Sequence, residues 1–196
     1  VPAYIAVRKN EFESAPYRLL HATLRLANAP TDKEQLRRMT KAFFDLEGIK
    51  IEVQDVIPLA SVSQEGYLRA WLQLASQRTE VSPVSRDLLE ATSKSLAERM
   101  DYWKFIAAAH QWFEQIKNQP SGSMSQAAFQ DFEDEQEIWT SLRADISQHY
   151  DVSELSLHNF LQELDLRAKE KPAPANAVRC LTIASSKGME FKHVYV

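Results

Sequence analysis

The sequence has little of what several classes of protein require. It contains one cysteine among 196 residues, Cys180, so an internal disulfide is excluded and a reducing, cytoplasmic location is expected. No stretch approaches the roughly 18 consecutive apolar residues of a membrane span. The opening residues, VPAYIAVRKN, also lack the order of charged and apolar residues that marks a signal peptide. These absences predict a soluble protein with no membrane partner.

The motifs that carry common enzyme chemistry are missing as well. The sequence has no G-x-x-x-x-G-K-[ST] phosphate-binding loop and no G-x-S-x-G nucleophile elbow. Its five histidines show no metal-ligand spacing with one another or with Cys180. We therefore predict no catalytic residue and no metal site within this chain.

Charge is distributed unevenly along a chain whose formal net charge is −4. Residues 1–50 hold nine basic residues against six acidic ones, whereas residues 131–137 hold five acidic residues and no basic one. The overall acidity excludes a uniformly basic nucleic-acid binder but permits a local patch that faces phosphates. Asp134 and Glu135 resemble a magnesium-binding acidic pair, but no apolar strand precedes them, so we interpret 131–137 as a solvated helical face.

Most of the chain has the apolar period of amphipathic helices. The first helix is expected after Pro16. Thr31 and Glu34 predict a capping box for the second helix, and Gly48 predicts its end. A further helical block is expected from about Ser63. One long helix is expected after Ser82-Pro83, continuing through Ile116. Two more helices are expected, one from about residues 123–126 and one over residues 157–168. Four tryptophans lie on these helical faces, where core packing is the simpler interpretation.

The apolar period changes at both ends of the sequence. Residues 1–7 and 178–183 predict strands, and residues 193–196 predict the start of another. Because two or three terminal strands cannot form a sheet with two covered faces, the layout predicts a mainly α chain. In it a helical insertion (16–168) separates two pieces of an incomplete α/β domain (1–15 and 178–196), with a linker at 169–177.

The stretch LTIASSKGMEF, residues 181–191, combines an apolar strand with small polar residues, a lysine and a glycine. Such a turn can present backbone N–H groups and Lys187 to phosphate oxygens. The carboxylate of Glu190 could then accept hydrogen bonds from the paired hydroxyls of a ribose. For this stretch alone, an ordinary surface loop is the alternative.

The longer string VRCLTIASSKGMEFKHVYV resembles motif V of the superfamily 1 DNA helicases of the UvrD, Rep and PcrA type. That motif consists of an apolar strand, Thr, usually His, a small polar pair, Lys-Gly-Leu-Glu-Phe and a second apolar strand. The segments VPAYIAVRKNEFESAPYRLLHATLRLAN and SLHNFLQELDLRAKE are similar to two further family segments. The residues that fall on motif V are Thr182, Ser185, Lys187, Gly188, Glu190 and Phe191.

The resemblance implies a piece of an ATP-dependent DNA helicase that acts in repair or replication: the helical 2B insertion with flanking parts of the RecA-like domain 2A. It implies ATP and Mg²⁺ as cofactors of the complete enzyme, and single-stranded and duplex or junction DNA as partners. Glu190 and Gly188 would bind the nucleotide, and Thr182, Ser185 and Lys187 would contact DNA. The isolated chain is expected to be inactive.

The chain departs from the family at several positions, which indicates a divergent branch. Ala184 replaces the usual histidine of motif V, and Ser14 and Pro16 stand where the early family segment has Arg and Glu. A glycine-isoleucine-glycine turn is reduced to Gly48-Ile49-Lys50. Two alternatives stay open: a helical protein-interaction or regulatory module that does not grip DNA, and a structural helical domain with an accidental match to the motif.

Overall fold

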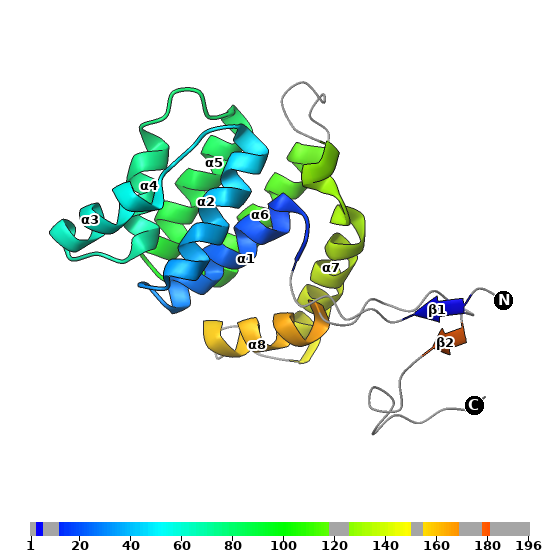
Figure 1. Ribbon diagram of the computed structural model, residues 1–196. Helices are drawn as coiled ribbons and strands as arrows, with labels where there is room; N and C mark the ends of the chain where they lie inside the picture. Colours follow the sequence, from blue (N-terminus) through cyan, green and yellow to red (C-terminus); the bar gives the residue numbers. More distant parts are fainter. Residues whose placement is uncertain (1–2, 6–11, 118–125, 150–154, 169–177, 181–196) are drawn as a thin grey trace.

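The computed structural model describes residues 3–5, 12–117, 126–149, 155–168 and 178–180 (Figure 1). Helices dominate these residues, as the sequence predicts. In chain order they are α1 (Ala15–Asn28), α2 (Lys33–Glu47), α3 (Val53–Ser63), α4 (Tyr67–Ser76), α5 (Pro83–Thr92), the π-helical turn η1 (Ser93–Ala97), α6 (Tyr102–Lys117), the 3₁₀ turn η2 (Gln126–Phe129), α7 (Phe132–His149) and α8 (Leu157–Ala168).

Two strands of three residues each, β1 (Ala3–Ile5) and β2 (Val178–Cys180), pair in parallel, with Ala3 opposite Val178. The mainly α prediction is therefore confirmed, whereas these two short strands do not form an α/β layer among the described residues. The predicted linker at 169–177, the predicted helix break at 118–124 and the third predicted strand at 193–196 lie outside the described residues.

Helix α1 lies at the centre of the helical body. It packs along α2 and also contacts α4, α6, α7 and α8, and Figure 1 shows α1 and α2 side by side. Ten of its fourteen residues are buried, which is far more than one amphipathic face provides. The central position of α1 therefore fixes how the other helices are arranged around it.

An aromatic cluster joins α1 to the helices that follow later in the sequence. The ring of Tyr17 lies 4.4 Å from that of Phe113 on α6 and 5.5 Å from that of Phe132 on α7, measured between centroids. Trp139 on α7 packs edge-on against Phe160 on α8 at 5.8 Å. Such pairs stabilise a core beyond the burial of their area. The predicted core role of the tryptophans is confirmed for Trp71, Trp112 and Trp139, each at most 2% exposed.

The ends of α2 show where the predicted caps were right and where they were wrong. Gly48 ends the helix with φ of 69°, the left-handed conformation that favours glycine. The start is one residue later than predicted, because Asp32 rather than Thr31 is the N-cap and its carboxylate accepts from the N–H groups of Glu34 and Gln35. Aspartate is among the strongest N-cap residues.

Two expectations about the middle of the chain were wrong. The helical block expected from about Ser63 begins at Tyr67 as α4, and the helix before it, α3, which starts at Val53 and contains Pro58, was not expected. The single long helix expected after Ser82 is interrupted by η1 and by Met100, whose φ is 55°. At that point the Asp101 carboxylate accepts from the N–H of Lys104 and starts α6 as a new helix.

The N-terminus of α5 receives a cap from another helix. Its own N-cap, Ser82, is the predicted one. In addition the carboxylate of Glu47, the last residue of α2, accepts from the Ser82 N–H at 2.9 Å, from the Ser82 hydroxyl at 2.9 Å and from the buried hydroxyl of Ser85. A carboxylate at a helix N-terminus is also favoured by the helix dipole. This contact links the α2 end to the α5 start.

Replacing Glu47 by Gln should lower the free energy of unfolding by about 1–3 kcal/mol, because hydrogen bonds to a charged acceptor are lost and an amide N–H₂ then faces donors. Urea denaturation of Glu47→Gln measures the change. Glu90→Gln is the matched control: Glu90 is an exposed carboxylate that pairs with Lys94, so its loss should leave the urea midpoint nearly unchanged. Equal stability of the two variants would contradict the interhelical cap.

Candidate functional site

The chain enters the helical body at Phe12 to Ser14, immediately before α1, and a carboxylate from α7 holds this entry. Glu135 is 4% exposed. One of its oxygens, Oε1, accepts from the Glu13 N–H at 2.6 Å, and Oε2 accepts from the Ser14 N–H at 3.2 Å and from the Ser14 hydroxyl. Ser14 makes no side-chain cap of its own to α1. Glu135 therefore caps α1 from another helix.

The prediction that residues 131–137 form a solvated face was wrong at Glu135. The exposed acids of this stretch are Glu133, Asp134 and Glu137. Glu135 is buried because the first N–H groups of a central helix need an acceptor that water cannot supply there. The sequence did contain a signal, since Glu135 is in helical phase with the buried Phe132 and Trp139.

Tyr17 lies one turn into α1, within the aromatic cluster. Burial raises the pKa of its hydroxyl above the ordinary value, and the negative charges of Glu135 and Glu114 raise it further. Each cause disfavours the phenolate. Tyr17 consequently stays protonated at a pH where an exposed tyrosine ionises.

The last turn of α8 is tied to the middle and the last turn of α1. Asp165 accepts from the Arg25 guanidinium, and its other oxygen lies 3.0 Å from Nε2 of His21. Phe12 packs edge-on against the His21 ring at 5.4 Å between centroids. The helix that begins after β1 and the helix that precedes β2 therefore contact each other directly.

A basic groove of about 220 Å³ runs between α1 and α2. Its charged lining consists of four cations and one carboxylate, together with His21. All of them come from the first fifty residues: Arg18, Arg37, Arg38, Lys41 and Glu34. The groove therefore presents an excess of positive charge on a chain that is acidic as a whole.

The cations of the groove share a small number of acidic partners. Arg37 and Arg38 both lie within 3.5 Å of Glu34, and Arg18 and Lys41 both lie within 3.0 Å of Asp45. Burial lowers the pKa of the neighbouring Arg25, Asp32 raises it, and the charge of Arg38 lowers it. The cations of α1 and α2 thus lie close to one another and share the acids that pair with them.

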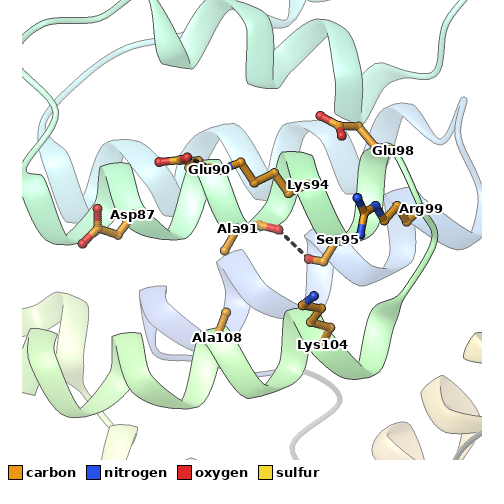
Figure 2. A pocket seen from close by; sticks show the side chains of 9 residues that line it. All are labelled: Asp87, Glu90, Ala91, Lys94, Ser95, Glu98, Arg99, Lys104 and Ala108. Atoms are coloured by element: carbon orange, nitrogen blue, oxygen red, sulfur yellow. Dashed lines mark hydrogen bonds and ion pairs between the residues drawn. The ribbon is translucent and has the colours of Figure 1, made fainter.

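A second, larger hollow of about 520 Å³ lies between α5, η1 and the first half of α6. Figure 2 shows its side chains on the two facing segments. Three acids and three bases line it: Asp87, Glu90, Glu98, Lys94, Arg99 and Lys104. Because these charges balance, the hollow offers no preference for an anion or a cation.

The residues predicted to form the nucleotide and DNA sites all lie outside the described residues. They are Gly188 and Glu190 for the nucleotide, and Thr182, Ser185 and Lys187 for DNA. Within the described ranges, no group of three or more His, Cys, Asp or Glu side chains could hold a metal ion. No described helix is long and apolar enough to cross a bilayer.

Comparison with known proteins finds no family model that matches the chain, no similar curated protein and no similar solved structure.

Glu135→Gln should lower the free energy of unfolding by about 1–3 kcal/mol, because an amide cannot accept from the N–H groups of Glu13 and Ser14 with both of its ends. The same change should speed hydrogen exchange at those two amides under native conditions. Glu137→Gln is the control: it removes an exposed carboxylate from the same helix and should change stability by no more than about 0.5 kcal/mol. Unchanged exchange at Ser14 would exclude the cap.

The raised pKa of Tyr17 predicts a loss of stability at high pH. In the unfolded chain the hydroxyl ionises near its ordinary pKa of about 10, whereas the folded chain keeps the proton. The free energy of unfolding should therefore fall as pH rises above about 10. Tyr17→Phe should make that fall less steep. Part of the fall should remain in the variant, because burial also raises the pKa of Tyr102. Urea denaturation across this pH range tests the prediction, and identical pH dependence in both proteins would contradict it.

Proposed function

We propose that the chain is a part of an ATP-dependent DNA helicase: the helical 2B-type insertion with pieces of the RecA-like domain that it interrupts. The observation that supports this most is the parallel pairing of β1 with β2. Parallel neighbours require a crossover connection, and here the connection contains the whole helical body. A helical insertion between adjacent strands of a parallel sheet has this arrangement.

The position of the motif V residues agrees with this proposal. Thr182 follows β2 by two residues, and the lysine and glycine of the motif come shortly after. In parallel α/β sheets, ligands bind at the carboxyl ends of the strands. Residues 182–190 would then lie at the edge of the sheet where nucleotides and phosphates bind.

In the complete enzyme, ATP and Mg²⁺ supply the phosphoryl chemistry, and the protein contributes positioning and charge. Glu190 would accept hydrogen bonds from the ribose hydroxyls, and Gly188 would let the backbone approach the nucleotide. Thr182, Ser185 and Lys187 would contact the DNA backbone or connect that contact to the nucleotide. A cytoplasmic role in DNA repair or replication belongs to the same proposal.

A second candidate is a protein-docking or regulatory module that does not grip DNA. The exposed carboxylates at the start of α7, Glu133, Asp134 and Glu137, favour it because they would suit a basic partner. The two candidates differ in whether the helical body itself has affinity for DNA.

Glu190→Ala in the complete helicase should lower kcat/KM for ATP by about ten- to a hundredfold, the equivalent of hydrogen bonds to a charged acceptor. The variant should also lose the ability to distinguish ATP from 2′,3′-dideoxy-ATP, because Glu190 is proposed to bind the hydroxyls that the analogue lacks. DNA-stimulated ATP hydrolysis is the measurement, with Glu137→Ala as the control. Unchanged kinetics with both nucleotides would remove this assignment of Glu190.

A further inference from the structure

One side of α2 carries three exposed cations at intervals of four residues, Lys33, Arg37 and Lys41, and the last two of them also line the basic groove. We infer that this row, which we call the α2 cationic row, binds successive phosphates of a nucleic-acid backbone, with the basic groove of Arg18 and Arg38 behind it. The choice of ligand rests on the proposed helicase function. The choice of residues rests on their placement in the structure.

The spacing of the row suits a linear array of charges. Residues four apart lie on the same face of a helix, and a rise of 1.5 Å per residue gives the row a length of about 12 Å. Neighbouring cations of the row are about 6 Å apart along α2. Three cations at this spacing can each meet one phosphate of a nucleic-acid backbone.

The cations of the row are accessible to solvent, and the ion pair between Arg37 and Glu34 is weak because both side chains are exposed. The side chains of Arg37 and Lys41 are 65% and 66% exposed, and Lys33 is also exposed. The carboxylate of Glu34, 3.4 Å from Arg37, is itself 59% exposed, and exposed pairs of this kind contribute only about 0–1 kcal/mol. A phosphate can therefore replace Glu34 beside Arg37 at little cost. Lys41 pairs at 3.0 Å with Asp45, which is 22% exposed and also pairs with Arg18, so at that position a phosphate competes with a shared carboxylate.

The charge balance of the two helices also favours an anion. The only acids on α2 itself are Glu34, Asp45 and Glu47, and Glu47 is engaged at the α5 N-terminus. The α1 helix has no acid at all.

The groove offers mainly phosphate contacts. Of its two ring side chains, Phe12 is 4% exposed and packs on Tyr17, and His21 is 13% exposed and lies 3.0 Å from Asp165, so neither presents an open ring face to a base. Recognition by phosphate contacts positions a protein on nucleic acid without selecting a sequence. Binding through the α2 cationic row should therefore be independent of sequence and strongly dependent on salt.

The hollow between α5 and α6 supplies a matched control. Lys94, Arg99 and Lys104 are exposed, as are the three cations of the row, but they face an equal number of acids (Figure 2). Changing three cations to Gln alters the net charge of the chain identically in both places. Glutamine is also a good helix former, so the helices should persist, which circular dichroism verifies.

The experiment measures fluorescence anisotropy of labelled duplex DNA with the 196-residue chain across a salt series. Three phosphate contacts at about 0.9 counterions each predict that affinity falls about 40-fold between about 50 and 200 mM salt. The triple variant Lys33→Gln/Arg37→Gln/Lys41→Gln should bind on the order of tenfold more weakly at low salt and lose most of that dependence. The control Lys94→Gln/Arg99→Gln/Lys104→Gln should keep the salt dependence of the unaltered chain.

If both triple variants lost the same amount of affinity for DNA, net charge alone would explain the loss. That result would overturn the inference, while the helicase proposal would stand. Failure of the unaltered chain to bind DNA at low salt would also overturn it, and the Glu190→Ala kinetics would then decide the helicase proposal independently. Tighter binding of a labelled polyglutamate peptide than of DNA, lost in the α2 triple variant, would assign the row to an acidic protein partner instead.

Discussion

The hydrogen bonds of one buried carboxylate, Glu135, make the central position of α1 possible. A helix that contacts neighbours along most of its surface cannot leave its first N–H groups to water, and an unpaired buried donor costs about 1–3 kcal/mol. Glu135 meets this requirement for Ser14, the N-cap residue of α1, and its other oxygen accepts from the N–H of Glu13 just before it. In return the buried charge of Glu135 is stabilised by the donors and by the dipole at the start of α1.

The same solution recurs elsewhere in the helical body. Glu47 caps α5 from the end of α2, and the Arg69 guanidinium on α4 donates to the carbonyl oxygen of Ala97 at the end of η1. Each contact satisfies a backbone group at a helix end with a side chain from another helix. These contacts link the ends of short helices, whose apolar faces alone would leave their relative positions less well defined.

Helices α1 and α2 combine structural and proposed binding roles on opposite faces. Their apolar faces fill the core with residues such as Leu24, Leu36 and Phe43, whereas the groove between them and the outer face of α2 gather the cations. Because the core positions are fixed by packing, the backbone of α2 keeps the three cations of the α2 cationic row on one side of the helix, within about 80° of one another around its axis. A rigid row of this kind suits a regular polyanion better than cations on a loop would.

The sequence by itself determined the mainly α fold, the central stripes of α1, α2 and α8, the turn at Gly48 and the uneven distribution of charge, because each depends on residues close together in the chain. Only the tertiary structure decided the rest. It divided the expected long helix at η1 and buried Glu135, an acid predicted to be solvated. It also placed cations of α1 and α2 around one groove, because pairing between distant residues depends on which helix ends and faces meet in the folded chain.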